Sequence, residues 1–440
     1  MTRAPTLKAG RGIIVDRRPL GVGAFRRLWV ASAVCAVGGS FSLAAIPTQL
    51  FTMTGSSAAV GASAVVSFVA LVVAALGTGA LADVRDRRTI LLAAHCGLTV
   101  TYAALWAQSV LDARSVPILM MLVACQGLTF GSIMTTMGAV LPRLVPVDLL
   151  PAANGLSSLV RYAGSILGPV LAGLLIPLVG LGTLYLFDAL ALPAVVWAVA
   201  KLPRLEPARA PNVPAGPHRG DHPALAQILA GFRYLAASRL LVAVLAVDLS
   251  AMVFGMPVAL FPELAQRTYG GPSGGGPALG LLYAAYPAGV FAIGLLSGTF
   301  TRARRQGALM AAAAAAWGIT VVVLGVAAQL WIALTALVLG GAVNFVLSTF
   351  RNAISQALTD DAMRGRIQGA LTVVLIGGPQ LANLLHGTTA SLLGPRTAIC
   401  AGGLLTTVAV AAIAWRVPEL RSYSMSTSDR DPDHSPENPR

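Results

Sequence analysis

Twelve long apolar runs dominate the pattern of hydrophobic and polar positions in this 440-residue chain. An α-helix needs about 20 residues to cross a hydrocarbon core of about 30 Å, and each run is about that length or longer. Short segments rich in basic residues separate many of the runs. The pattern predicts an all-α membrane protein with twelve transmembrane helices at residues 28–52, 57–81, 89–110, 116–140, 154–178, 182–202, 239–262, 278–299, 308–328, 331–352, 367–390 and 396–416.

The composition agrees with a surface that faces lipid. Hydrophobic residues make up 56% of the chain and charged residues only 11%, whereas soluble domains carry roughly a quarter of charged residues. We therefore expect the lipid bilayer to surround most of the protein.

The formal net charge of +14 raises the alternative of a nucleic-acid partner. However, the basic residues form small clusters between apolar runs, without the interleaved aromatic side chains that stack on bases. We expect no nucleic-acid binding. The four cysteines lie inside apolar runs without C-x-x-C spacing, which is typical of buried hydrophobic positions, and no metal site is predicted.

The distribution of Lys and Arg predicts the orientation, because cytoplasmic segments carry an excess of both. With the N-terminus inside, the outer segments hold only Arg114, Arg267 and Arg396, and Arg161 lies within a span. The other 27 of the 31 basic residues then lie on the cytoplasmic side. We therefore expect both termini to be cytoplasmic.

One interior break, residues 203–238, is longer than the others and divides the runs into two sets of six. It begins rich in proline, and we interpret it as a cytoplasmic linker between an N-terminal half, 28–202, and a C-terminal half, 239–417. Residues 1–27 are expected to be a cytoplasmic segment. Residues 418–440 are expected to be a disordered cytoplasmic tail, because Ser, Asp and Pro predominate there.

The two halves also share a local pattern. An R-x-R-R cluster follows the second run at Arg85–Arg88, and another follows the eighth run at Arg302–Arg305, 217 residues later. This separation is close to half the chain length, as a duplicated six-helix unit would give. Transporters commonly place the substrate between two such repeats, which move against each other.

The segment after the second run reads Gly79-Ala-Leu-Ala-Asp83-Val-Arg-Asp86-Arg87-Arg88. The glycine favours close approach of a neighbouring helix. An acidic residue beside arginines can form ion pairs, and pairs that exist in only one conformer shift the equilibrium between two conformers. The alternative is a basic anchor that only fixes the orientation. The full pattern favours a gate.

This segment resembles the signature loop of the major facilitator superfamily. A second superfamily pattern, associated with antiporters, resembles the glycine and proline positions of the fifth run, where Ala172 replaces one glycine. Small residues permit tight packing there, and a proline removes a helix hydrogen bond and bends the helix. The matching positions are Gly155, Gly164, Gly168, Pro169 and Gly173.

Three further stretches resemble the enterobactin (siderophore) exporter family: 229–238, 282–287 and 363–369. The resemblance is shared by macrolide and multidrug efflux relatives. It implies a secondary active exporter of a siderophore-like amphiphilic solute in the bacterial inner membrane, driven by inward proton flow, with multidrug efflux as the alternative. Two positions depart from the residues that relatives often use for proton coupling. Many relatives carry an acidic residue in the first span, where this chain has Gly38-Gly39-Ser40, and an arginine in the fourth span, where it has Val123.

Three ionisable residues inside the spans are candidates for coupling or substrate binding, because a charge at bilayer depth is costly and rarely kept without a role. Arg161 either attracts an anionic substrate, forms a switchable ion pair or belongs to a structural pair. Asp248 is the first choice for a proton-carrying carboxyl group, with a helix–helix hydrogen bond as the alternative. Asp188, near the outer end of the sixth span, is expected to cap a helix or reach water.

Uncharged polar side chains in the spans need hydrogen-bond partners as well. His95 and His386 are either proton relays or hydrogen-bonded packing residues. Five amides are candidates to line a cavity: Gln49, Gln126, Asn344, Gln380 and Asn383.

Other function classes fit the sequence poorly. Neither Lys8 nor Lys201 lies in a G-x4-G-K-[ST] nucleotide loop. A serine protease would use Ser273, which lies in a glycine-rich segment without a fixed base, although His386 is conceivable. A sensor would need a larger soluble domain. We predict a transporter rather than an enzyme, a monomer without a cofactor, with protons and a small-molecule substrate as its partners.

Overall fold

The computed structural model describes residues 16–82, 85–205, 233, 236, 238–272, 274–296, 305–359 and 364–424. These residues form helices and no β-strand. Most of the expected linker at 203–238, residues 302–304 of the second R-x-R-R cluster and most of the tail lie outside the described residues.

The described residues of the N-terminal half form a bundle of the six helices α1 to α6, and a short 3-10 turn precedes the bundle at Arg18–Gly21. Its helices are α1 (Gly23–Gly38), α2 (Ser42–Thr54), α3 (Ser57–Ala82), α4 (Arg87–Val110), α5 (Val116–Leu144) and α6 (Leu150–Ala200).

The C-terminal half repeats this arrangement. Its elements are α8 (Arg239–Gly255), η3 (Val258–Leu260), α9 (Phe261–Glu263), η4 (Leu264–Thr268), α10 (Pro277–Leu295), α11 (Gln306–Val326), α12 (Leu330–Ala357), α13 (Arg364–Leu393), α14 (Pro395–Arg416) and α15 (Pro418–Ser422).

Among the described residues, nine helices are long and apolar enough to cross a membrane. The longest, Val147–Ala200, contains two of the expected spans. They meet at Gly180, whose φ of 78° and ψ of 163° are non-helical and interrupt α6. The predicted membrane fold is confirmed, and the count of twelve crossings stays a prediction.

Three elements differ from the expected ones. The first span is two helices, α1 and α2, because the chain breaks around Gly39. The seventh span continues past its expected end through α9 and a π-helical turn, η4. The expected disordered tail begins instead with α15, whose Leu420 is buried.

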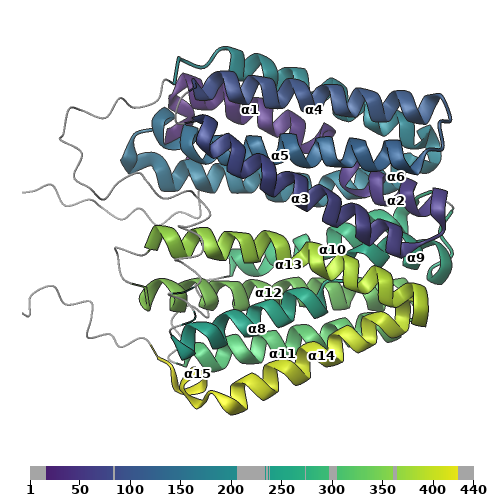
Figure 1. Ribbon diagram of the computed structural model, residues 1–440, viewed down its shortest axis with the longest axis vertical. Coiled ribbons are helices and arrows are strands. Elements are labelled where there is room, and N and C mark those ends of the chain that lie inside the picture. Colours follow the sequence, from purple (N-terminus) through teal and green to yellow (C-terminus); the bar gives the residue numbers. More distant parts are fainter. Residues whose placement is uncertain are drawn as a thin grey trace, which may run out of the picture.

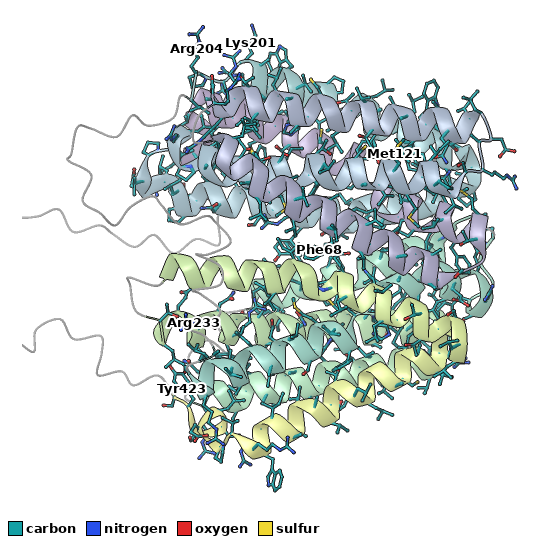
Figure 2. The ribbon with its side chains drawn as sticks, in the orientation of Figure 1. Phe68, Met121, Lys201, Arg204, Arg233 and Tyr423 are labelled. Carbon is teal, nitrogen blue, oxygen red and sulfur yellow. The ribbon has the colours of Figure 1, made fainter. Side chains whose placement is uncertain are left out.

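Figure 1 shows the two halves side by side, with their helices running in the same general direction. We call the end that carries Asp16, Leu205 and Tyr423 the terminus end, and the end that carries Gly55, α9 and Gly394 the distal end. Basic Lys201, Arg204 and Arg233 lie at the terminus end (Figure 2). The halves meet where α3 packs against α13 and α6 packs against α10.

The largest buried hydrophobic cluster joins the halves. It contains Phe41 and Ile176 of the N-terminal half together with Leu260 and Leu279 of the C-terminal half. Many large apolar side chains on the outside of the bundle are exposed, such as Val100, Leu178 and Trp415. Exposed apolar surface of this extent fits a lipid-facing protein.

Candidate functional site

At the distal end, polar contacts tie one half to the other. The hydroxyl of Ser57 donates to Oε2 of Glu263 at 2.5 Å, and Nη1 of Arg267 donates to Oε1 of the same carboxylate at 2.5 Å. Nη2 of Arg267 donates to the Gly55 carbonyl oxygen at 3.3 Å, and the guanidinium lies 5.3 Å from the centre of the Phe51 ring. We call these five residues the distal latch. The Glu263 side chain is buried, and these partners supply hydrogen bonds to both of its carboxylate oxygens.

The glycine and proline positions of the fifth span close the interface between α6 and α10. A Cβ atom at Gly173 would lie 2.6 Å from the Gly276 carbonyl oxygen. A Cβ atom at Gly280 would lie 2.5 Å from the Pro169 carbonyl oxygen. Only residues without a side chain allow this approach, so the motif sets the contact between the halves.

The same motif also fits α6 against the first span. A Cβ atom at Gly164 would lie 2.7 Å from the Ala36 carbonyl oxygen, and one at Gly168 would lie 2.5 Å from Cβ of Ser40. Gly155 differs, because a Cβ atom there would meet no atom of the described residues within 4 Å. The expectation of tight packing at Gly155 is therefore wrong for this conformation, since Gly155 lies on the exposed side of α6, whereas the adjacent Ala153 and Leu156 are buried.

Toward the terminus end, a cavity of about 700 Å³ separates the halves. We call it the terminus-side cavity, and α6, α10 and α12 line it. Arg161 is exposed on its wall, where Nη2 donates to the Ser158 hydroxyl at 2.8 Å and the guanidinium lies 5.9 Å from the centre of the Tyr162 ring. Among the described residues, Arg161 forms no ion pair. Its charge therefore faces the cavity.

A second arginine, Arg351 of α12, lines the same cavity but has a carboxylate partner. Its Nη1 donates to Oδ1 of Asp248 on α8 at 2.8 Å, and both side chains are buried. Oδ2 of Asp248 has no hydrogen-bond partner among the described residues. Two guanidinium groups thus line the cavity, and the carboxylate of Asp248, which pairs with one of them, is not part of the lining, so the cavity has an excess of positive charge.

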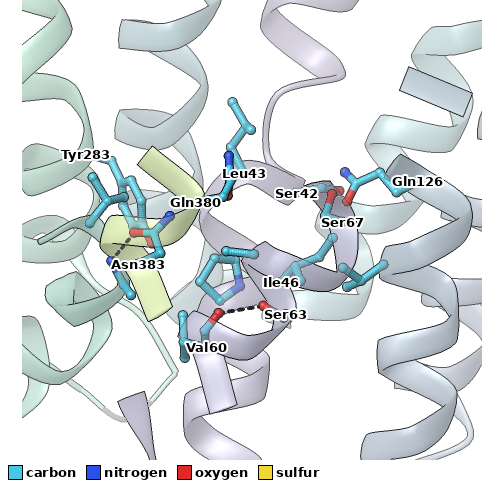
Figure 3. A pocket seen from close by; sticks show the side chains of 15 residues that line it. Ser42, Leu43, Ile46, Val60, Ser63, Ser67, Gln126, Tyr283, Gln380 and Asn383 are labelled. Carbon is cyan, nitrogen blue, oxygen red and sulfur yellow. Dashed lines mark hydrogen bonds between the residues drawn. The ribbon is translucent and has the colours of Figure 1, made fainter. Parts of the chain in front are cut away.

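A smaller cavity of about 220 Å³ lies between the halves, and amides and hydroxyls line it together with apolar side chains. We call it the central cavity. Gln126 enters from the N-terminal half, and Gln380, Asn383 and Tyr283 enter from the C-terminal half (Figure 3). Oδ1 of Asn383 accepts from the Ala259 backbone N–H at 3.0 Å. These groups can bind hydroxyl or carbonyl groups of a solute without any change of charge.

The third candidate, Asp188, lies behind this cavity. Its Oδ1 accepts from the Phe41 backbone N–H at 3.2 Å, and its Oδ2 accepts from the Ser42 N–H at 2.8 Å and from the Ser42 hydroxyl. The carboxylate therefore binds the free N–H groups at the start of α2, where helix ends leave donors without partners. Asp188 of α6 caps the second part of the broken first span.

The segment after the second span is tied to backbone groups. Nη1 of Arg87 donates to the Ala139 carbonyl oxygen at 3.4 Å, and Nη2 of Arg88 donates to the Ala200 carbonyl oxygen. Asp86 accepts from the Arg88 N–H at 2.9 Å and caps α4. Neither arginine pairs with a carboxylate of a described residue, and Asp83 lies outside the described residues.

Close packing at Gly79, expected from the same motif, is not found in this conformation. A Cβ atom at Gly79 would meet no described atom within 4 Å, because α3 faces open space there. Other members of the motif hold the ends of α5 and α6 at the terminus end.

The other polar candidates separate into two groups. His95 and His386 hydrogen-bond to the Leu91 and Phe254 carbonyl oxygens, at 2.8 Å and 3.0 Å, and both side chains are buried. Among the amides, Gln126, Gln380 and Asn383 line the central cavity, and Asn344 lines the terminus-side cavity. Gln49 lines a small distal pocket instead. Ser273 lies outside the described residues.

Sequence reasoning missed three residues of this site. Arg351 stands next to the expected end of its span, where a basic residue is typical of a cytoplasmic segment. Glu263 follows directly after the expected end of the seventh span. Ser57 begins an apolar run and had no distinguishing pattern. The signal that could have found Arg351 is a partner search for Asp248, since buried charges occur in pairs.

Known proteins resemble this chain along most of its length. A family model described as transmembrane secretion effector matches residues 16–438. The enterobactin exporter EntS of Shigella boydii serotype 18 is 28% identical over 402 residues, which cover 91% of this chain and 93% of that protein. EntS of Escherichia coli O139:H28 gives the same identity and coverage.

Solved structures share the fold at lower identity. The nucleoside transporter NupG has a TM-score of 0.70 at 12% identity and covers 91% of this chain and 100% of its own. A bacterial homologue of the iron transporter ferroportin, in an inward-facing state, has a TM-score of 0.65 at 14% identity and covers 91% of this chain and 99% of its own.

Proposed function

Because this chain belongs to the transmembrane secretion effector family of the major facilitator superfamily, we propose that it exports a small amphiphilic organic anion from bacteria. Membrane transport, rather than enzymatic chemistry, is common to the relatives and to the fold. The chain is a multi-pass membrane transporter. We propose the identity of the solute, the ion that drives transport and the transport mechanism.

The observation that carries this proposal is the charge of the terminus-side cavity. Arg161 and Arg351 contribute two positive charges and Asp248 one negative charge. A guanidinium group binds carboxylate or phosphate groups through several hydrogen bonds. We assign the terminus end to the cytoplasm, so that this cavity receives the anion from inside the cell.

Transport would proceed by alternating access between the two ends. Contacts between the halves at the distal end, including the distal latch, support a conformer that is open toward the cytoplasm. The opposite conformer requires the Ser57–Glu263 contact to break. The latch therefore stabilises one of two states, as a conformational equilibrium requires.

The Asp248–Arg351 pair supports proton antiport. A proton on Asp248 removes the charge that holds Arg351, so the pair exists in only one protonation state. In this proposal, a proton from outside breaks the pair and drives the return of the empty carrier. The membrane potential is an additional force, because moving one charge across 100 mV is worth about 2.3 kcal/mol.

The proposal is tested by transport into inside-out vesicles that contain the full chain. Enterobactin, the solute named for the relatives, is the first probe, and erythromycin is the probe for the multidrug alternative. A pH gradient and a membrane potential are imposed separately. Accumulation of enterobactin that follows the pH gradient supports the proposal. Transport that ignores the gradient defeats the proton part, and erythromycin transport alone favours the multidrug alternative.

The distal latch has its own test. Replacing Glu263→Gln weakens the charge-assisted hydrogen bond from Ser57, which crosses between the halves, and a loss of about 1–1.5 kcal/mol shifts the equilibrium roughly tenfold toward the distally open state. The readout is labelling of Ser63→Cys in the central cavity by a membrane-impermeant thiol reagent from outside, with the native cysteines replaced. The matched control is Glu419→Gln, which removes an exposed pair with Arg239 at the terminus end. Equal labelling rates in both variants would contradict the role of the latch.

A further inference from the structure

A third cavity, lined by apolar and aromatic side chains, lies inside the C-terminal half. Its volume is about 160 Å³, and it lies where η3 and α9 meet α10, α11 and α12. An apolar protein cavity of about 150 Å³ stays dry and can hold one benzene molecule. The size and the lining therefore fit a single six-membered ring.

Two pairs of aromatic rings form much of its wall. Phe261 and Tyr283 meet edge to face, with ring centres 5.2 Å apart. Tyr286 and Trp317 meet in the same way at 5.5 Å. Aromatic rings prefer such edge-to-face or offset contacts with further rings, so these walls favour an aromatic group over an aliphatic one of equal size.

The cavity is rigid because Trp317 is fixed on two sides. Its indole N–H donates to the Ala251 carbonyl oxygen at 3.0 Å. A Cβ atom at Gly255 would lie 2.3 Å from the indole nitrogen, and one at Gly340 would lie 2.3 Å from Cζ3 of the same ring. The indole thus occupies space that a side chain at Gly255 or Gly340 would fill. A wall that is already in place costs little ordering on binding.

The cavity shares its tyrosines with both polar cavities. Tyr283 also lines the central cavity, and Tyr286 also lines the terminus-side cavity that holds Arg161. The hydroxyl of Tyr283 is buried without a hydrogen-bond partner among the described residues, and buried polar groups are normally satisfied. A ring held between these tyrosines can extend polar substituents toward either cavity.

We propose that this cavity, bounded by Tyr283, Tyr286, Trp317, Phe261, Val258 and Leu337, is an aryl subsite that holds one monocyclic aromatic ring of the transported anion. The inference rests on the proposed function and deepens it: the solute combines an acidic group for the terminus-side cavity with a single aromatic ring. Fused bicyclic rings are too large for the space.

The test measures binding of three acylated glycines to the full chain in lipid nanodiscs. Hippurate carries a phenyl ring, 2-naphthoylglycine carries a fused bicyclic ring, and acetylglycine carries no ring, while the carboxylate is the same. Full burial of a ring is expected to make hippurate bind at least about tenfold more tightly than acetylglycine. Equal binding of these two probes, or no measurable hippurate binding, overturns the inference.

Two substitutions at Leu337 change the space in opposite directions. Leu337→Phe fills the cavity and should reduce the preference for hippurate over acetylglycine at least fivefold. Leu337→Ala enlarges it and should improve binding of 2-naphthoylglycine relative to hippurate by a similar factor. Leu339→Ala, on the exposed face of the same helix, is the matched control and should leave both ratios unchanged. If the ratios in both Leu337 variants equal those of the control, the subsite is refuted.

Arg161→Gln separates this inference from the proposed function. This substitution should weaken the binding of hippurate and of acetylglycine by the same factor, because both probes lose the same contact with a positive charge. If it has no effect while the ring preference persists, the proposed anion site fails and the aryl subsite stands. If the substitution weakens the binding of both probes and the affinity does not depend on the ring, the anion site stands and the aryl subsite fails.

Discussion

In the described part of the chain each half of the molecule buries one aspartate, and the two carboxylates have different partners. Asp188 in the N-terminal half accepts from two backbone N–H groups and one hydroxyl at the start of α2. Asp248 in the C-terminal half pairs with Arg351, and its second oxygen has no partner in the described part of the chain.

The difference teaches what each carboxylate can do. The donors around Asp188 are fixed by a helix end, so they can leave only if α2 moves. The donor on Asp248 is a long side chain at a cavity wall, and a side chain can exchange one anion for another. Both aspartates are buried, but the pairing in the C-terminal half is the one that a proton or a solute can change.

The largest predicted effect on stability is that of Arg351→Gln. The substitution leaves Asp248 buried without its cation, and breaking a buried pair in this way costs about 3–5 kcal/mol. The measurement is chemical unfolding of the purified protein in detergent. The exposed pair between Arg239 and Glu419 provides the control, since Arg239→Gln should cost less than about 1 kcal/mol.

The double variant Arg351→Gln with Asp248→Asn sharpens this prediction. It removes both charges and should recover most of the lost free energy of unfolding, because two amides can bond to each other. If the double variant is as unstable as the single one, the loss comes from packing and the contrast between the halves disappears.

A smaller effect is predicted for Asp188→Asn. An amide keeps one acceptor oxygen but cannot accept from all three donors around Phe41 and Ser42, so the free energy of unfolding should fall by about 1–3 kcal/mol. Transport driven by a pH gradient should persist in this variant and fall at least tenfold in Asp248→Asn. A stable Asp188→Asn protein that ignores the pH gradient would move the coupling role to the N-terminal half.

The smallest effect is predicted for Ser42→Ala, which removes one hydroxyl donor and leaves both backbone donors on Asp188. One neutral hydrogen bond contributes about 0.5–1.5 kcal/mol, and the same unfolding experiment measures it. A loss as large as that of Asp188→Asn would show that the hydroxyl, rather than the helix end, holds the carboxylate.

The membrane fold was predictable because apolar length is a local property of the chain. The break between α1 and α2 was not, because Gly38-Gly39-Ser40 lies inside an apolar run. The start of α2 is capped by Asp188, which is 146 residues from Ser42. A hydrogen bond between residues so far apart leaves no periodic pattern in the sequence.

The site was predictable only in part for the same reason. Arg161, Asp188 and Asp248 stand out as charges within apolar runs, and Gly164, Gly168 and Gly173 stand out as a motif. Arg351 and Glu263 stand at the edges of expected spans, where a charge is ordinary. Their roles depend on Asp248 and Ser57, which approach them only in the folded protein.

The most direct test of the central claim, that the halves open alternately at their two ends, is a distance measurement between spin labels in the protein in lipid nanodiscs. Labels at Leu111→Cys and Ala328→Cys report the distal end, and labels at Val147→Cys and Arg305→Cys report the terminus end, all at exposed positions in a background without the native cysteines. Addition of solute or a change of pH should shift the two distances in opposite directions. Active protein in which both distances stay fixed, or change in the same direction, would contradict alternating access.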